Sequence, residues 1–434
     1  TIPLFCLIYV VKFLPTFLEL REKYMLTIKP TYFRLLTFLF TLALDFGISQ
    51  EYNWSANLRF RARTDKDSSV EWQETFASIT ETRSRLGLDI LGEHASAKFI
   101  LQDSRYLGNS ENNPGVTATA GSPFLHQAFF TFRNLKIPFF DYDFIKIGRF
   151  ELALGNQRLI AKNNWNNIGR SFEGVLGRDN FLSGELLLMH LFIKETMDES
   201  HDDRDDVVID GVYWTKTIPF LEENSVYDLY FLNFRNMGFF ESGNSLASYN
   251  NIGLRFNGQK DSFILETELS LQTSSLTSSE NDISANLFSF NLGYEFASTR
   301  FLSSVSMGLD RISGDDSSTE VAEGFSKEFG ARHKHHGYYD YKDHRKYFGH
   351  DHDGLNEVNM KANIDILRST NLLVALHSFR SDVNDIYYGH EMNFIFKTKH
   401  NNEVSSEIGS VFYLPDPEED NTPPFFYLMI TANF

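Results

Sequence analysis

The sequence of 434 residues predicts an all-β protein, a transmembrane antiparallel β-barrel of about 18 strands with long extracellular loops and short periplasmic turns. Three observations lead to this prediction. An apolar segment typical of an export signal lies near the start of the chain, and apolar and polar residues then alternate with period two. The connections between these segments are alternately short and long.

Residues 25–49 are predicted to be a secretory signal peptide. Lys29 gives the start of this segment a positive charge, and residues 35–44 form an apolar run of signal-peptide length that is too short to span a bilayer. Gly47 and Ser49 are small residues at the third and first positions before the expected cleavage site. The alternative is a buried N-terminal helix.

Residues 1–24 begin with Thr and contain a second apolar run that Lys12 interrupts. We expect this segment to be an upstream extension of the reading frame, with Met25 as the true start. If the segment is translated, an N-terminal anchor is the alternative. Residues 50–434 are then expected to form a single barrel domain.

The composition excludes some classes of function. A formal net charge of −18 argues against nucleic acid as a partner, because phosphates require basic surfaces. The one cysteine, Cys6, precedes the predicted mature chain, which suits an oxidising compartment. Aromatic residues make up 15% of the chain, as in a barrel with aromatic girdles, although an aromatic-rich soluble β-sandwich would share this feature. No cofactor is expected.

Period-two alternation is the dominant pattern after residue 50. One example is the apolar series Phe288, Phe290, Leu292, Tyr294 and Phe296, which alternates with Ser289, Asn291, Gly293 and Glu295. Successive side chains of a strand point to opposite faces, so such a segment has one apolar and one polar face. Segmentation on this pattern predicts strands at 52–63, 82–91, 94–103, 125–135, 143–151, 171–180, 183–193, 207–217, 226–234, 249–257, 262–271, 285–296, 299–310, 357–367, 370–380, 388–397, 403–413 and 425–434.

The connections alternate in length. Those after even-numbered strands are mostly short, such as residues 92–93, 258–261 and 368–369, whereas those after odd-numbered strands include 104–124 and 311–356. A barrel with both ends in the periplasm predicts this asymmetry, and a soluble sandwich does not. The last predicted strand alternates up to Phe434, and a terminal aromatic residue is the usual mark that the outer-membrane insertion machinery recognises.

If the apolar face meets lipid, the polar face lines a water-filled lumen. The charged residues expected to face inward are Arg83, Arg85, Lys98, Arg255 and Lys361, together with Glu266, Glu268, Glu295, Asp310, Asp365, Glu391 and Glu407. Cations would lie mainly on early strands and carboxylates on late ones, and such a separation creates a transverse field. The alternative is that facing charges neutralise one another.

Residues 147–176 carry a pattern of glycine, arginine and aromatic residues that resembles the alginate-export family of outer-membrane porins. Its members here are Gly148, Arg149, Gly155, Arg158, Leu159, Trp165, Asn167, Arg170, Phe172 and Gly174. Residues 82–87 are similar to an early arginine-bearing strand of that family, and residues 313–316 and 333–341 to its late long loop. Two positions depart from the family pattern, with Phe150 where Gln is usual and Glu173 where Asp is usual.

The resemblance implies an 18-stranded barrel and an arginine-lined constriction that attracts the carboxylates of a polyuronate. The residues at the matching positions are Arg83, Arg85, Arg149, Arg158 and Arg170. Guanidinium suits this task because it stays charged and pairs bidentately with carboxylate. For each arginine the alternative is a salt bridge that only stiffens the wall.

The connection at 311–356 is rich in histidine. Its imidazoles are His333, His335, His336, His344, His350 and His352, and aspartates are interleaved with them. This mixture would suit Zn²⁺ or Cu²⁺, although the spacing matches no closed site. A connection of this length is more typical of a loop that folds inward as a plug or gate.

These features predict a non-enzymatic, monomeric porin of a Gram-negative-type outer membrane, in contact with its lipid. Its expected cargo is a polar or anionic oligosaccharide, with a polyuronate such as alginate as one candidate. The alternatives are a general diffusion porin, an outer-membrane hydrolase that uses Ser378 beside His377, and a secreted carbohydrate-binding β-protein.

Overall fold

The computed structural model describes most of the predicted mature chain, and its residues 52–434 form one compact unit. The described residues are 51–64, 78–107, 123–137, 140–194, 207–219, 221, 225–236, 248–274, 282–297, 301–327, 329–339, 352–415 and 422–434. The predicted signal peptide and the segment before it lie outside these residues. The described part of the chain contains no helix that is both long and apolar enough to cross a membrane.

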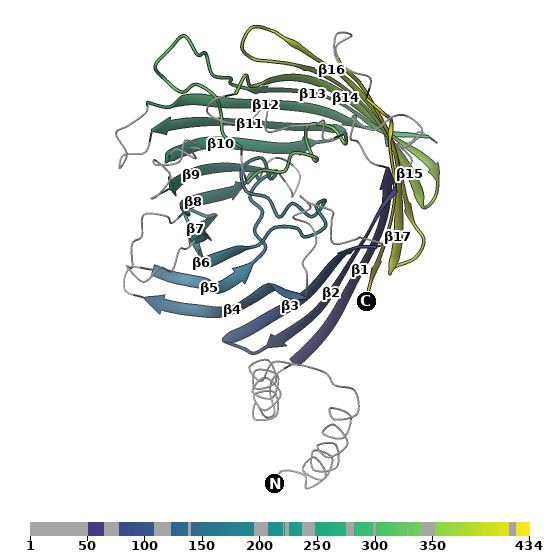
Figure 1. Cartoon of the computed structure of the whole chain (residues 1–434). Coiled ribbons are helices and arrows are strands. Elements are labelled where there is room, and N and C mark those ends of the chain that lie inside the picture. Colours follow the sequence, from purple (N-terminus) through teal and green to yellow (C-terminus); the bar gives the residue numbers. More distant parts are fainter. Residues whose placement is uncertain are drawn as a thin grey trace, which may run out of the picture. The chain divides into compact units, whose positions relative to one another are not determined.

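Eighteen antiparallel strands form a closed barrel, because each strand pairs with its neighbours in sequence and β18 pairs with β1 (Figure 1). The first nine are β1 Glu51–Thr64, β2 Ser78–Leu91, β3 Ala95–Tyr106, β4 Phe124–Ile137, β5 Phe140–Phe150, β6 Phe172–Phe181, β7 Gly184–Lys194, β8 Val207–Thr217 and β9 Val226–Asn236. The others are β10 Tyr249–Lys260, β11 Phe263–Ser274, β12 Ser284–Glu295, β13 Leu302–Ile312, β14 Leu355–Leu367, β15 Thr370–Arg380, β16 Tyr387–Lys399, β17 Val404–Pro415 and β18 Phe425–Asn433.

The strand prediction is confirmed, since each predicted range matches one strand with ends within four residues. The alternation of connection lengths is confirmed as well. Residues 182–183 and 368–369 are two-residue turns, whereas 151–171 and 313–354 are long connections. We call the two ends of the barrel the turn end and the loop end.

The distribution of side chains over the wall is the reverse of that in a soluble protein. On β10, the outward side chains of Ile252 and Leu254 are 50% and 46% exposed, while the inward side chain of Asn251 is only 1% exposed. An apolar outer surface and a polar inner surface are the arrangement that a lipid environment requires.

The inner face is nevertheless not polar throughout, and the expectation of a wholly polar lumen is wrong for β7–β10. The inward side chains of these strands include Leu191, Ile209, Leu232, Phe234 and Tyr249, all of which are buried. They are buried because two long connections fold into the barrel and cover them.

These connections are the first inner loop, residues 151–171 between β5 and β6, and the second inner loop, residues 313–327 and 329–339 between β13 and β14. Figure 1 shows both inside the ring of strands. The backbones of the two loops pair with each other where Ala161 N donates to Phe329 O at 2.9 Å and Ala331 N donates to Gln157 O at 2.8 Å. The Phe329 ring also stacks on Phe234 of β9 at 5.8 Å. The prediction that the 311–356 connection folds inward is thus confirmed for its described part.

Two glycines lie near the point where the first inner loop leaves the strands of the wall. Gly148 on β5 and Gly174 on β6 are cross-strand partners with φ values of 125° and 149°. A Cβ at either position would lie within 2.4 Å of a backbone oxygen of a neighbouring strand, Ala128 O on β4 for Gly148 and His190 O on β7 for Gly174. Glycine is therefore required at this pair, which explains two positions of the sequence motif.

Candidate functional site in the barrel lumen

Arginines on β1 and β2 hold the first inner loop against the early strands. Arg59 donates to the backbone oxygens of Asn164 at 2.7 Å and Asn166 at 3.2 Å, and Arg61 donates to that of Trp165 at 2.8 Å. Arg83 donates to the Asn164 oxygen at 3.3 Å. A loop segment without regular structure keeps its carbonyl groups hydrogen-bonded in this way.

The guanidinium groups of this wall differ in their charge partners. Arg61 forms an ion pair with Glu81, and Arg85 lies 3.0 Å from Glu151. Arg59 and Arg83 bond to backbone or amide oxygens instead, and within the described ranges neither forms an ion pair with a carboxylate.

The early wall therefore carries excess positive charge. Among the described residues, its five inward arginines, Arg59, Arg61, Arg63, Arg83 and Arg85, are paired with two carboxylates, Glu81 and Glu151, a formal excess of three positive charges. Arg59 and Arg83 are only 5% and 6% exposed. Charges that are screened less by solvent act over a longer range than exposed ones.

On the opposite wall, two arginines lie among four carboxylates. Arg158 of the first inner loop donates to Asp310 on β13 at 2.8 Å and lies 4.0 Å from Glu268 on β11. Burial alone would lower the pKa of Arg158, but these two carboxylates raise it above its ordinary value. Arg255 on β10 lies 2.7 Å from Asp228 and 2.9 Å from Glu266. Each of these arginines thus lies between two carboxylates, so the six side chains together have a formal excess of two negative charges.

The five arginines expected from the sequence do not gather at one point. Arg83 and Arg85 belong to the early wall, and Arg158 belongs to the opposite one. Arg170 donates to the backbone oxygens of Ala161 and Phe329, and so joins the two inner loops.

Arg149 lies on the outer face of the barrel, so its expected place in the lumen is wrong. It has the strand parity of Ile147, which is 43% exposed, and it pairs with Glu173 at 2.6 Å. The sequence contained this information, because Ile147 and Arg149 are two residues apart on one strand. Arg59 and Arg61 were missed for the opposite reason: they alternate with Leu58 and Phe60 on the polar parity of β1, but they lie outside the resemblance.

The remaining residues of the motif build the first inner loop. Trp165 stacks on His333 of the second inner loop at 3.7 Å, and Arg61 lies 4.5 Å above its ring. Asn167 is buried and accepts a bond from Arg59 at 3.0 Å. Leu159 and Phe172 belong to the apolar core between the loops and the wall, and Gly155 has a φ of 49°.

The histidines of the second inner loop have different surroundings. His336 Nδ1 lies 2.6 Å from Glu357 of β14, and its Nε2 lies 2.7 Å from Lys327 Nζ. His335 contacts the backbone oxygen of Asn156 at 3.0 Å. His352 contributes its backbone oxygen to Asp315 N. His344 and His350 lie outside the described residues.

Asp310, His336 and Glu357 place one ligand atom each within 4.8 Å of one another, which is compatible with a metal site. The surrounding cations argue against this use. Lys327 Nζ is hydrogen-bonded to His336 Nε2, and Arg158 forms an ion pair with Asp310. Burial lowers the pKa of Lys327 to about 7 and that of His336 to about 4. The geometry is that of a hydrogen-bonded anchor that ties the second inner loop to β14.

The residue pair considered for a hydrolase is not assembled. His377 faces inward and lies 2.7 Å from Glu357, whereas Ser378 has the outward parity of Leu376. Neighbouring residues of a strand point to opposite faces, so this histidine does not activate this serine.

Comparisons with known proteins agree with this geometry. OccAB1 of Acinetobacter baumannii is 12% identical, with a TM-score of 0.59 over 90% of this chain and 98% of that chain. OccK9 (OpdG) of Pseudomonas aeruginosa is 10% identical, with a TM-score of 0.60 over 88% of this chain and 98% of that chain. A BenF-like porin from Pseudomonas fluorescens Pf-5 is 11% identical, with a TM-score of 0.60 over 89% and 100%.

At these identities the likeness concerns the fold, which is that of outer-membrane porins. No curated protein sequence matches the chain. The family model described as alginate export matches residues 39–412, which is most of the chain. The protein therefore belongs to the alginate-export family of outer-membrane β-barrel porins.

Proposed function

We propose that this porin passes anionic oligosaccharides selectively, and that polyuronates such as alginate are among its cargo. The observation that carries the proposal is the pair Arg59 and Arg83. Both guanidinium groups are buried in the lumen wall without a carboxylate partner among the described residues. Their charge attracts anions to the early side of the lumen, because a low-dielectric wall strengthens a local field.

The inner loops favour a selective channel over a general diffusion porin. The first inner loop reaches the early strands through Arg59 and Arg61 and the opposite wall through Arg158. A solute must pass beside this chain of contacts rather than through an open ring of strands. A narrow, charged passage discriminates among solutes by size and by sign.

Solute flux into liposomes tests this proposal. Proteoliposomes that contain the full chain would be supplied with a hexauronate or with maltohexaose, a neutral oligosaccharide of equal length. We expect faster entry of the hexauronate, with a difference that shrinks at high salt because screening weakens the field. Equal rates for the two oligosaccharides at all salt concentrations would support the alternative of general diffusion.

We further propose that the loop end faces the cell exterior and the turn end the periplasm. The support is the alternation along the barrel of short connections, most of them two to four residues long, with longer ones.

A further inference from the structure

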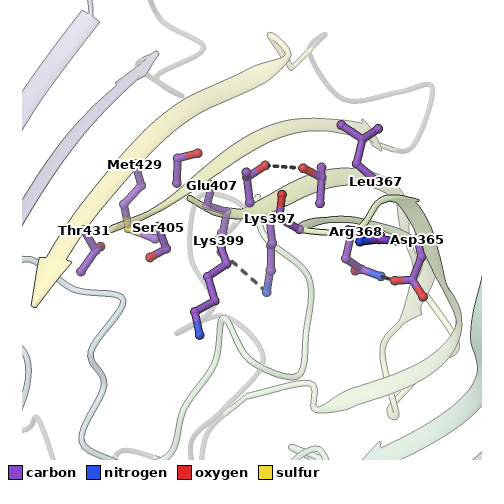
Figure 2. Close-up of a pocket in the computed structure, with 14 residues that line it drawn as sticks. Asp365, Leu367, Arg368, Lys397, Lys399, Ser405, Glu407, Met429 and Thr431 are labelled. Carbon is purple, nitrogen blue, oxygen red and sulfur yellow. Dashed lines mark hydrogen bonds and ion pairs between the residues drawn. The ribbon is translucent and has the colours of Figure 1, made fainter. Parts of the chain in front are cut away.

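A hollow of about 380 Å³ lies inside the barrel at the turn end of β14–β18 (Figure 2). Its lining includes Lys397, Lys399, Glu407 and Met429. These residues have the inward parity of Ile395, which is fully buried, whereas Phe396 and Ile408 on the same strands are exposed outside. The hollow therefore belongs to the lumen.

The charges of this hollow are unevenly paired. Glu407 accepts a hydrogen bond from the Tyr427 hydroxyl at 2.5 Å and lies 3.6 Å from Lys397 Nζ. Asp365 accepts a hydrogen bond from Asn371 at 3.2 Å. Both carboxylates thus have partners within the wall, and Figure 2 shows them among the side chains that line the hollow.

Two cations remain without such partners. Lys399 on β16 and Arg368 in the 368–369 turn both line the hollow and form no ion pair or side-chain hydrogen bond with any residue that the structure describes. Lys397 differs from them, because it lies beside Glu407 and interacts with the Tyr338 hydroxyl of the second inner loop. The free positive charge of the hollow thus resides on Lys399 and Arg368.

The rest of the lining suits a sugar. Ser405 and Thr431 supply hydroxyl groups, and Leu367 and Met429 supply apolar surface. A pyranose ring presents hydroxyl groups at its edge and C–H groups on its faces, so it needs both kinds of contact. The volume is within the range of small-molecule sites, which is about 300–1,000 Å³.

We propose that this hollow is a docking subsite for one carboxylated sugar residue at the turn end of the channel, with Lys399 and Arg368 as its binding cations. This inference rests on the proposed transport of anionic oligosaccharides and adds a second cationic site to it. The site borders β1, because its lining residues Thr431 and Met429 are the cross-strand partners of Arg59 and Arg61, but the guanidinium groups of those arginines contact the first inner loop. A uronate chain that reaches the turn end is held here while its next residues approach the inner loops.

Blockade of single channels in planar bilayers tests the subsite. Hexauronate added on the turn side should interrupt the current of the full-length wild-type channel, and maltohexaose should not. The double variant Lys399→Gln with Arg368→Gln should bind hexauronate about three- to tenfold more weakly, the effect of losing two exposed ion pairs. The control variant Lys260→Gln removes an exposed lysine from β10 at the same end. Hexauronate should block this variant as strongly as it blocks the wild type.

A chemical rescue shows whether weaker blockade results from the lost positive charge or from a folding defect. Lys399→Cys in a Cys6→Ser background has a single thiol. Trimethylammonioethyl methanethiosulfonate, which its permanent charge makes membrane-impermeant, restores the positive charge when applied from one side, and the side on which it reacts identifies the turn end. Blockade should return after this reagent and should weaken further after the sulfonatoethyl analogue.

The outcomes separate this inference from the proposed function. If the wild-type channel prefers anions and hexauronate blocks the double variant as strongly as the wild type, the subsite is overturned and selective transport stands. An absence of hexauronate blockade from the turn side of the wild type also overturns the subsite. If the channel shows no preference for anions or for hexauronate from either side, the proposed function fails as well.

Discussion

Arg158 of the first inner loop donates from Nη1 to the Asp310 carboxylate of β13 at 2.8 Å, and both side chains are buried. Glu268 of β11 lies 4.0 Å from Nε of the same guanidinium. One side chain of the loop thus compensates two carboxylates on the wall. Its removal leaves buried charges without a partner, which is more costly than the loss of an exposed ion pair.

Arg158→Met should therefore loosen the first inner loop and lower stability by about 3–5 kcal/mol. The expected signs are a lower urea midpoint in lipid vesicles and larger fluctuations of the open-channel current. Adding Asp310→Asn and Glu268→Gln removes the uncompensated charge and should restore much of the stability. A variant as stable as the wild type would show that Arg158 does not anchor the loop.

Phe290→Arg should hinder folding by about 2–4 kcal/mol, because the Phe290 side chain projects from the middle of β12 toward lipid. Asn291→Arg is the matched control, because Asn291 follows Phe290 in sequence and its half-buried side chain points to the inner side of the same strand. Ser289 is unsuitable as a control, because it is only 1% exposed. Folding yields into vesicles compare the two variants, and equal losses would contradict the assignment of the faces.

Docking of the second inner loop should weaken as the pH falls from about 6.5 to about 4. Burial and the nearby Lys327 lower the pKa of docked His336 to about 4, against the opposing effect of Glu357, from its ordinary value of 6.5. The released loop then binds a proton more readily than the docked loop, so acid favours release. Lys327, whose pKa burial lowers to about 7, binds its proton mainly above this window.

Channel fluctuations recorded across this pH range measure the release. His336→Gln keeps a hydrogen-bonding side chain that does not titrate, and it should remove much of the pH dependence. Asp310 and His377 also face this cluster, so a remaining dependence at the acid end is expected from carboxylate protonation. A wild-type channel whose fluctuations do not change with pH would contradict the anchoring role of His336.

Cysteine labelling on intact cells tests the orientation of the barrel. In a Cys6→Ser background, Ser318→Cys in an exposed part of the second inner loop should react with an impermeant maleimide, and Asn402→Cys in the 400–403 turn should not. Gly337 is a poor position for a label, because a Cβ there would lie 2.4 Å from the Glu391 carboxylate. If Asn402→Cys were labelled and Ser318→Cys were not, the turn end would face the exterior, and the proposed orientation would be wrong.

The sequence predicted the wall of the barrel well, because period-two alternation and turn length are local properties. All eighteen strands were found, as were Arg83 and Arg85 on an inward parity of β2. The apolar inner face of β7–β10 was missed. The run Leu186–Leu188 on β7 places apolar residues on both faces, which is a sign of burial on both sides, but nothing local showed that the inner loops provide the cover.

The pairing of charges was less predictable, since it depends on contacts between distant segments. Arg158 and Asp310 are separated by 152 residues, and no pattern in either segment links them. The sequence motif located the first inner loop, yet it did not show that Arg59 and Arg61 hold that loop, or that Arg149 lies outside.

The most direct test of the account is the reversal potential of the channel in a salt gradient. Arg59→Gln combined with Arg83→Gln removes two buried positive charges of the early wall that lack a carboxylate partner among the described residues, while the amides still donate to the loop carbonyls. Arg149→Gln, on the outer face, is the matched control. The account predicts that the double variant has a lower anion-to-cation permeability ratio than the wild type and that the control is unchanged. A reversal potential that is the same in all three channels would contradict it.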